Sequence, residues 1–416
     1  MHDLLIKGGR VIDPARGLDG IMDVAVRGRA ISKLGRDIPA AEASEVIDAS
    51  GKVVSPGLVD LHAHVYRHGD YLDADELCGV RAGVTSIVDA GSVGAAEFAD
   101  FRDEVVRPSK ATVYGFLYNH WWPSGYEPED EIYKDRHIDI DGIVELAGKY
   151  PDIVKGVKVA VTPPIRRKYG LEPIVRGREA ARAAGIRLML HVGDISAPAL
   201  EATPSEVTAE ALDLLDPGDI LTHVFSPLTG GGLDEDGRVL PALSAAKERG
   251  VVMDAAIGDY QFSWEAAEKV LAEGILPDVI SSDIEIHSGP AASAGVMVRD
   301  RRVTGERVAA KMTLVEYMAY FLELGFAVED IVRMTSSAPA RAADIGNVAG
   351  TLEEGRPADI SVLEVLSGRF ALTDVTGVTR VGERAIAPVV TIKEGRVYEP
   401  GRGAHDWGFA PPAAAG

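Results

Sequence analysis

The sequence predicts an α/β protein, a (β/α)8 TIM barrel that carries a small β-sandwich domain formed from both chain ends. Two observations predict this architecture. Eight short apolar runs alternate with amphipathic stretches through the middle of the chain, and strand-like segments separated by turns occupy both ends. Fully apolar strands separated by helices indicate a parallel sheet, and eight such units are the number found in a (β/α)8 barrel.

The apolar runs cover residues 57–64, 84–90, 112–118, 154–161, 187–192, 219–225, 251–257 and 279–283. Amphipathic stretches that predict helices lie between them at 95–106, 143–150, 174–184, 209–215, 240–249 and 264–273. Two further helices are expected at 312–324 and 328–334, after a long loop. A doubly wound sheet is the alternative, but no Gly-x-Gly-x-x-Gly turn follows an early strand.

The two ends of the chain have a different pattern from its middle. Short alternating segments bounded by glycine turns fill residues 1–54, and the same pattern returns at 348–400. We therefore expect a barrel at 55–347 beside one β-sandwich domain built from 1–54 and 348–400. Residues 401–416 are rich in Gly, Pro and Ala, which predicts a disordered tail.

The composition of the chain argues against several classes of function. The chain has 416 residues and a formal net charge of −21, which argues against binding to nucleic acid or to anionic membranes. No apolar run reaches the roughly 18 residues that a membrane-spanning helix needs. Residues 1–9 are too acidic and too weakly apolar for a signal peptide, and Cys78 is the only cysteine. These features predict a cytoplasmic protein and do not identify its substrate.

The segment 57–64 contains two histidines, His62 and His64, one residue apart at the end of a predicted strand. Residues i and i+2 of a strand face the same side, so both rings can point at one metal ion. The alternative is a pair of structural histidines whose ring nitrogens bond to backbone or water.

Other predicted strands also end in residues that bind metals. In a barrel, the active site lies at the carboxyl ends of the strands. The polar residues that occupy these positions are His62, His64, Lys158, His191, His223 and Asp283. Any one histidine could be a core residue, but the set together predicts a metal site.

These residues, in this order, resemble the amidohydrolase superfamily of metal-dependent hydrolases. The segment 56–64 resembles the strand-one motif of that family, and segments 334–340 and 355–360 are similar to its return into the small β domain. Within the superfamily the chain looks most like the dihydroorotase-related amidohydrolase/deacetylase branch. Some members of that branch act on acetylated α-hydroxy or α-amino acids. The residues 222–223 and 230–237 carry this closer likeness.

The resemblance implies a binuclear centre with two divalent metal ions, usually zinc. His62, His64 and Asp283 would hold the more buried ion. His191 and His223 would hold the more exposed one, and Lys158, carboxylated by CO2, would bridge both. The implied mechanism is attack by a hydroxide shared between the ions, with Asp283 as general base and then general acid.

The chain departs from its relatives at two positions that bear on carboxylate binding. Dihydroorotases usually carry an arginine two residues after the second strand-one histidine, where this chain has Tyr66 followed by Arg67. The deacetylase-like branch commonly has an arginine where this chain has Ala160. Dihydroorotase activity is therefore disfavoured. Arg166 or Arg167 could contact the substrate carboxylate instead, and the alternative is that both are simply solvated arginines.

The loop after the third predicted strand contains His120, Trp121 and Trp122. Because it follows a strand end, it is expected over the barrel mouth, where these side chains would line a substrate pocket. The alternative for the aromatic residues is a subunit interface, and the resemblance implies a homo-oligomer.

The preferred function is a deacetylase or deacylase that cleaves an amide or ester of an α-substituted carboxylate. Two alternatives remain. One is a cyclic amidohydrolase that opens a ring, as dihydroorotases and hydantoinases do. The other is a non-catalytic member of the superfamily, which the six intact ligand positions argue against.

Overall fold

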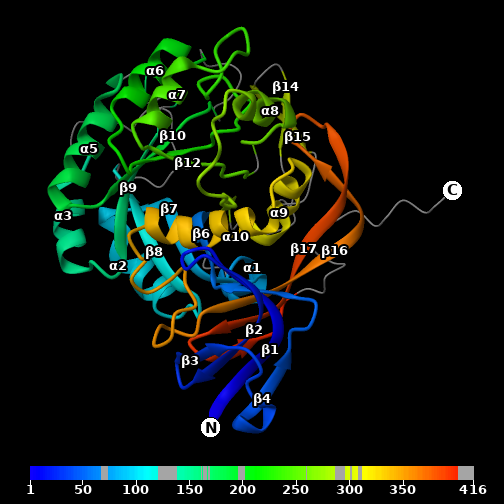
Figure 1. Ribbon diagram of the computed structural model, residues 1–416. Coiled ribbons are helices and arrows are strands. Elements are labelled where there is room, and N and C mark those ends of the chain that lie inside the picture. The colour runs from blue at the N-terminus through cyan, green and yellow to red at the C-terminus, as the bar shows by residue number, and fades with distance from the viewer. Residues whose placement is uncertain are drawn as a thin grey trace.

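The computed structural model describes residues 1–66, 74–119, 138–160, 162, 166, 169–194, 202–258, 260–285, 296–299, 302–307 and 312–401. Within these residues the chain forms two eight-stranded sheets. In Figure 1, β1–β4 of one sheet (residues 2–48) lie at the bottom of the molecule, while β16 and β17 of the same sheet (residues 360–393) run up its right side. A separate hairpin pairs β14 (Val296–Arg299) with β15 (Arg302–Arg307).

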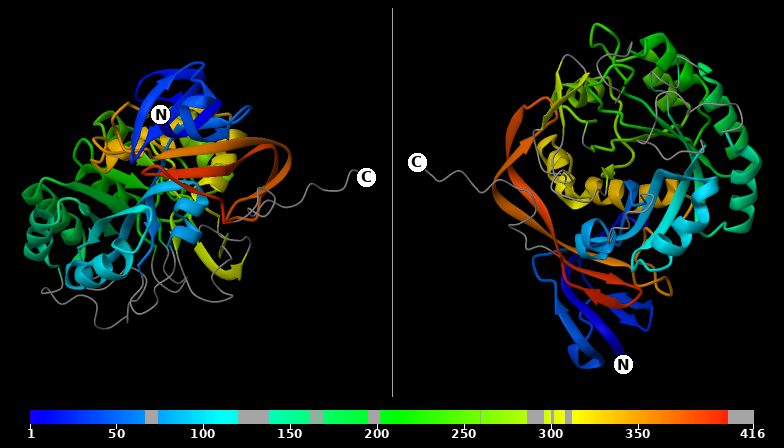
Figure 2. Two further views of the ribbon diagram at one scale, coloured as in Figure 1. Left: turned by 90° about the horizontal axis from the view of Figure 1, so that it is seen from below. Right: turned by 180° about the vertical axis from the view of Figure 1, so that it is seen from behind.

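The first sheet is parallel and has the strand order β12-β11-β10-β9-β8-β7-β6-β13. Its strands are β6 (Leu58–His64), β7 (Val84–Gly94), β8 (Thr112–Tyr118), β9 (Val154–Ala160), β10 (Arg187–His191), β11 (Ile220–Thr222), β12 (Val252–Asp254) and β13 (Ile284–Glu285). The sheet curls, as the view from behind in Figure 2 shows. The expectation of a parallel sheet built from the apolar runs is therefore confirmed.

The last predicted strand differs from the expectation. Only Val279 of the run 279–283 forms a ladder bridge, to Asp254, and β13 begins at Ile284. The reason is the backbone of Asp283, whose φ of 50° interrupts the extended conformation. The segment still bonds on both sides, because Ala255 N donates to Val279 O and Asp283 N donates to His62 O (2.7 Å).

Helices surround the curled sheet in the view from behind in Figure 2. They include α3 (Ile140–Lys149), α5 (Glu172–Ala184), α6 (Ser205–Asp213), α7 (Pro241–Glu248) and α8 (Trp264–Ala272). The predicted helix at 95–106 consists of the 3-10 turn η3 (Ala95–Glu97), α2 (Phe98–Phe101) and the π-helical turn η4 (Arg102–Val106). Helices α9 (Leu314–Glu323), α10 (Val328–Thr335) and α11 (Ser337–Ala342) follow the sheet in the chain.

The two faces of the parallel sheet pack differently. In β10, Leu188 and Leu190 join the large core that includes helix α5. Met189 belongs to a second core with residues of β6, β7, β8 and α11. Because Met189 and His191 lie two residues apart in one strand, they face the same side. This second core therefore supports the face that carries the predicted metal ligands.

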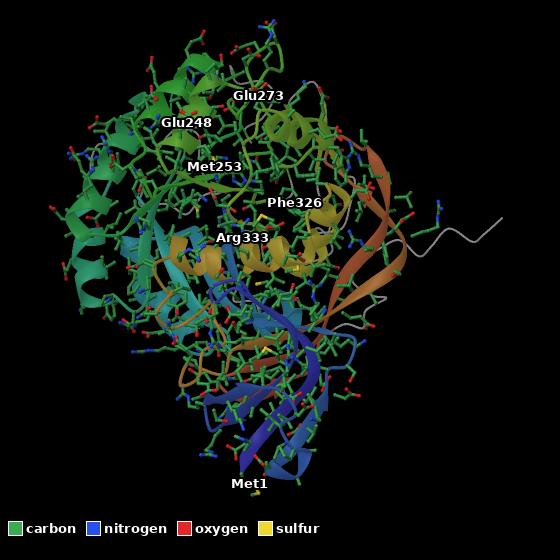
Figure 3. All side chains as sticks on the ribbon, viewed as in Figure 1. Met1, Glu248, Met253, Glu273, Phe326 and Arg333 are labelled. Atoms are coloured by element: carbon green, nitrogen blue, oxygen red, sulfur yellow. The ribbon has the colours of Figure 1, made fainter. Side chains whose placement is uncertain are left out.

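The second sheet joins the two ends of the chain. Its strands are β1 (His2–Asp13), β2 (Leu18–Arg27), β3 (Ala30–Gly35), β4 (Ala43–Asp48), β5 (Val53–Pro56), β16 (Ile360–Thr373), β17 (Thr379–Lys393) and β18 (Arg396–Tyr398). β5 lies between β1 and β16, which links the N-terminal strands to the C-terminal ones. In Figure 3, Met1 lies at the outer end of this sheet, far from Met253 in β12.

Among the described residues, no helix is long and apolar enough to cross a membrane. Of the predicted tail at 401–416, residues 402–416 lie outside the described residues.

Candidate metal centre

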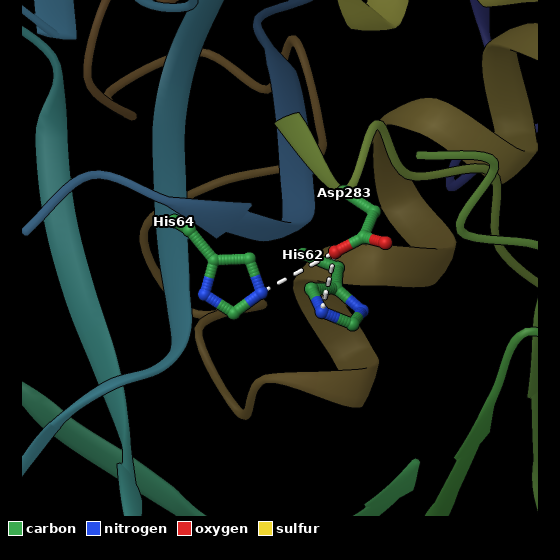
Figure 4. Close-up of side chains that lie close together, drawn as sticks. All are labelled: His62, His64 and Asp283. Carbon is green, nitrogen blue, oxygen red and sulfur yellow. Dashed lines mark ion pairs between the residues drawn. The ribbon is translucent and has the colours of Figure 1, made fainter. Parts of the chain in front are cut away.

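His62 and His64 meet Asp283 at the end of β6 (Figure 4). Nε2 of His62 lies 3.1 Å from Oδ1 of Asp283, and Nε2 of His64 lies 3.3 Å from the same oxygen. The ligand atoms of the three residues all lie within 4.8 Å of one another. Two imidazole nitrogens and a carboxylate oxygen therefore surround one point, in the spacing that a single metal ion needs.

Lys158 reaches this cluster from β9. Its Nζ lies 2.9 Å from Nε2 of His62 and donates to the carbonyl oxygen of Ala90 (3.1 Å). Burial lowers the pKa of Lys158 to about 8, although nearby carboxylates such as Asp283 oppose the shift. The amine is therefore far closer to its neutral form at neutral pH than an exposed lysine is.

His191 and His223 stand side by side on the neighbouring strands, with ring centroids 4.5 Å apart. The ring of His223 also lies 5.1 Å from the ring of His62. The structure thus brings the six predicted ligands into one cluster at the carboxyl ends of β6, β9, β10 and β11 and beside β13.

The protonation of the histidine rings follows from their partners. Thr222 Oγ1 donates its single proton to Asp254 Oδ2 (2.8 Å), so it accepts from Nδ1 of His62 at 2.9 Å. Nε2 of His191 donates to Gly193 O at 3.0 Å. In each ring one nitrogen is held by an acceptor, which leaves the other nitrogen available as a ligand.

In His223, too, one ring nitrogen donates to an acceptor, and the other is buried without a partner within the described ranges. Its Nδ1 donates to Ala256 O at 3.0 Å, while its buried Nε2 has no hydrogen-bond partner within the described part of the chain. A buried polar atom without a partner is uncommon and indicates a ligand that binds there. The donor set of imidazole nitrogens and carboxylate oxygen matches zinc and similar divalent ions. The residues therefore fit the metal centre that the sequence predicts.

The charges in the cluster also favour a cation. Burial opposes ionisation of Asp283, yet the charges of His62 and His223 and hydrogen bonds from His62 and His64 hold its pKa well below the ordinary value. Burial and Lys158 oppose a charge on His62, but Asp283 and Asp254 outweigh them and raise its pKa. Burial, with Lys158, lowers the pKa of His191 to about 3, so this ring is neutral and can bind a metal.

Two of the six residues have unusual backbone conformations. His223 has a φ of 70° and Asp283 has a φ of 50°. Such left-handed conformations cost about 1–3 kcal/mol in residues other than glycine and persist where the surrounding structure holds them. His223 directly follows β11 and Asp283 directly precedes β13, and the turn in the backbone aims both side chains at the cluster.

Supporting residues around the cluster were missed in the sequence. Ser92 Oγ lies 2.9 Å from Nδ1 of His64, and Asp254 accepts from Thr222 and from Ser281 (2.6 Å). Asp254 ends β12, so the rule that polar residues at strand ends form the site could have found it. Ser92 lies beyond the predicted strand 84–90, and nothing in its sequence context marks it.

The residues predicted to contact the substrate are only partly described. His120, Trp121, Trp122, Arg67 and Arg167 lie outside the described residues. Arg166 is described, and its Nη2 donates to Ala202 O at 3.3 Å while its buried Nε has no partner among the described residues.

The two positions at which the family resemblance implies arginine are occupied by buried side chains. Tyr66 packs edge-on against Phe101, and its hydroxyl donates to Asp100 at 3.0 Å. Ala160 packs with Tyr118 and Tyr169. Neither position offers a cation to a substrate carboxylate.

Comparison with known proteins agrees with this geometry. Two models described as "Amidohydrolase family" match residues 246–397 and 45–92. A deacetylase of Agrobacterium fabrum is 30% identical over 353 residues, which cover 83% of this chain and 79% of that protein. A deacetylase of Enterococcus faecalis is 28% identical over 96% of this chain and 99% of its own length.

A solved structure extends the likeness to the whole fold. The crystal structure of an adenine deaminase superposes with a TM-score of 0.80 at 27% identity, covering 96% of this chain and all of that one. Proteins of this superfamily generally use divalent metals. The length and identity of the deacetylase match, together with the family models, show that this chain belongs to the amidohydrolase family of hydrolytic enzymes.

Proposed function

We propose that the protein is a binuclear metal-dependent hydrolase that removes an acyl group from an α-substituted carboxylate by cleaving an amide or ester bond. The observation that carries the proposal is the convergence of His62, His64 and Asp283 on one point. The other three potential ligands, Lys158, His191 and His223, lie beside that point. The two deacetylase relatives support the choice of an open-chain acyl substrate.

In this proposal His62, His64 and Asp283 would hold one ion, and His191 and His223 would hold the other. Lys158 lies beside His62, and its lowered pKa supports a reaction with CO2. The neutral amine of Lys158 forms an N–C bond to CO2 and releases a proton. This reaction would convert the amine into an anionic carbamate, whose oxygens can act as metal ligands. Zinc is the proposed metal, because nitrogen and carboxylate donors suit it. When bound, the ions would activate water and polarise the substrate carbonyl.

Asp283 is the proposed general base and acid. Its low pKa keeps the carboxylate ionised at neutral pH, so that it can accept a proton from the attacking water. The same carboxyl group then delivers that proton to the leaving nitrogen or oxygen. Its position between the rings of His62 and His64 supports this role, since the atom that loses the proton and the atom that receives it are both bonded to the same acyl carbon.

The finer description of the fold is also a proposal. We propose that the curled parallel sheet closes into a (β/α)8 barrel, limited to 55–347, beside a β-sandwich domain from 1–54 and 348–400. Two hydrogen bonds support closure, from Ala255 N to Val279 O and from Asp283 N to His62 O, because they connect the last segment to both ends of the sheet.

Arg166 is the proposed contact for the substrate carboxylate. It follows β9, as a residue at the mouth of the site would, and its unpaired buried Nε supports an additional acceptor. Arg167, His120, Trp121 and Trp122 stay predictions from the sequence. A homo-oligomeric, cytoplasmic state is likewise a prediction.

The test is proton release in a pH-stat by protein loaded with zinc and bicarbonate. Open-chain N-acyl and O-acyl acids are offered beside cyclic ureides and imides. We expect turnover of the open-chain compounds. Turnover of the cyclic ureides and imides alone would replace this proposal with the cyclic amidohydrolase alternative. No proton release with any of the compounds would reject both functions.

A further inference from the structure

Gln261 is a buried amide that nothing in the metal centre uses. Its side chain lies in the segment between β12 and α8, and the residue is only 1% exposed. Both Oε1 and Nε2 are buried and have no hydrogen-bond partner anywhere in the described part of the chain. A buried carboxamide with neither its donor nor its acceptor paired is costly, so it indicates a binding partner.

The carboxamide lies against the turns that follow two of the predicted ligands. A Cβ atom on Gly193 would lie 2.9 Å from Oε1 of Gln261 and 2.8 Å from Oγ of Ser226. Gly193 is the residue whose carbonyl accepts from His191, and Ser226 N donates to His223 O. Gln261 is thus at the rim of the cluster, on the side of the proposed second ion.

The same segment also contacts the opposite side of the cluster. A Cβ atom on Gly258 would lie 2.2 Å from Oδ2 of Asp283, so this glycine packs directly on the carboxylate. Gln261 N donates to Ile257 O, and Ser263 N donates to Phe225 O. The segment is held by backbone bonds before and after Gln261, which fixes where the carboxamide can reach.

We infer that Gln261 is a specificity-determining residue that pairs with an N-acyl α-amino acid and selects amides over esters. Its Nε2 donates to a substrate carboxylate oxygen, and its Oε1 accepts from the substrate N–H. This inference rests on the proposed deacylase function and names the substrate class within it.

The chemistry of the two candidate substrates decides between them. In an extended residue the N–H and the C=O point to the same side, as they do where paired strands exchange two hydrogen bonds. An N-acyl α-amino acid therefore presents one donor and one acceptor to the edge of a carboxamide. An O-acyl α-hydroxy acid has no such donor and would place an ester oxygen against Oε1. A site built around a donor discriminates strongly against an analogue that lacks it.

The experiment compares matched N-acetyl α-amino acids and O-acetyl α-hydroxy acids with methyl, benzyl and phenyl side chains, on zinc-loaded protein. Values of kcat/KM are measured for the wild-type enzyme and for Gln261→Met, which keeps the shape and removes both polar atoms. We expect Gln261→Met to lower kcat/KM by about 100-fold for the N-acetyl compounds and by less than about 10-fold for the O-acetyl ones. Intrinsic differences in reactivity cancel in this comparison.

A control variant and a stability measurement separate substrate binding from packing. Ser337→Ala removes another buried, unpaired polar atom, on α11, and is expected to leave the ratio of amide to ester turnover unchanged. Without substrate, Gln261→Met is expected to melt at or above the wild-type temperature, because it removes unpaired buried groups. A structural glutamine would instead lower the melting temperature when replaced.

Each remaining outcome overturns the inference. Equal losses for amides and esters in Gln261→Met would remove its role in selection. If the wild-type enzyme hydrolyses only the esters, the proposed selection of amides by Gln261 is wrong, while the deacylase proposal stays in place. A wild-type enzyme that hydrolyses neither class would overturn the deacylase function and this inference with it.

Discussion

Gly258 packs directly on the carboxylate of Asp283, with space for no side chain between them. A Cβ atom at this glycine would lie 2.2 Å from Oδ2. Gly258→Ala is expected to push the carboxylate away from His62 and His64 and to lower kcat by about 100-fold, the cost of a displacement near 1 Å.

Gly274→Ala is the matched control for this prediction. Gly274 and Gly258 both have positive φ, 78° and 52°, so alanine pays a similar backbone penalty of about 1–2 kcal/mol at either site. Gly274 has no atom within 4 Å of an added Cβ. Both variants are expected to melt earlier than wild type, and only Gly258→Ala is expected to lose activity. Equal activity in the two variants would contradict this account.

Removing the proposed proton carrier tests the role of Asp283 directly. Asp283→Asn keeps one oxygen ligand but cannot accept a proton, so kcat is expected to fall by about 10³-fold with the fold intact. Asp278→Asn, at the other end of the same segment, is the control, because Asp278 bonds only to Lys247 and the backbone of Met253 in the described structure. Circular dichroism checks that the variant is folded. Near wild-type turnover by Asp283→Asn would rule out the role of Asp283 as general base and acid.

Thr222 links His62 to Asp254 and so fixes the proton on Nδ1 of that histidine. Thr222→Val has almost the same shape and lacks the hydroxyl. We expect it to weaken metal binding by about 10–100-fold, as the loss of a hydrogen-bond partner behind a ligand usually does. Thr222→Ser keeps the hydroxyl and is expected to bind like wild type. Titration against a competing chelator measures both, and identical affinities for valine and serine variants would refute the linkage.

The lowered pKa of Lys158 predicts a pH dependence for its reaction with CO2. With a pKa of about 8, about a tenth of the amine is neutral at pH 7 and most of it is neutral above pH 9. Only the neutral amine attacks CO2, so at constant dissolved CO2 the rate of carboxylation of metal-free protein is expected to rise with pH and level off above about 8. Carbon-13 bicarbonate and NMR give the measurement. Lys158→Met is expected to abolish the signal and Lys155→Met to keep it, whereas a signal that survives in Lys158→Met would assign it elsewhere.

The sequence predicted the parallel sheet and the ligand cluster because both depend on local patterns. Apolar runs mark strands, and parallel strands bring their carboxyl ends to one edge, so His62, Lys158, His191 and His223 were found without knowing any contact. The strand at 279–283 was misjudged because the left-handed backbone of Asp283 has no signal in the apolar pattern.

Contacts between distant segments could not be predicted in this way. Thr222, Asp254 and His62 form a hydrogen-bonded chain across three strands. The sequence of one strand does not show which side chains of other strands it will contact. The role of Gln261 could not be predicted for the same reason. It is inferred from the burial of the side chain and from the absence of a hydrogen-bond partner in the described structure. Nothing in its immediate sequence distinguishes it from a surface glutamine.

If two metal ions in this cluster support hydrolysis of an open-chain acyl acid, activity must follow metal occupancy. The initial rate of N-acyl acid hydrolysis by chelated protein is measured as zinc is added back in bicarbonate buffer, with bound metal counted at each step. We expect negligible activity without metal and a rate that rises until two ions are bound per chain. Full activity in the metal-free protein, or a rate that saturates at one ion per chain, would contradict this expectation.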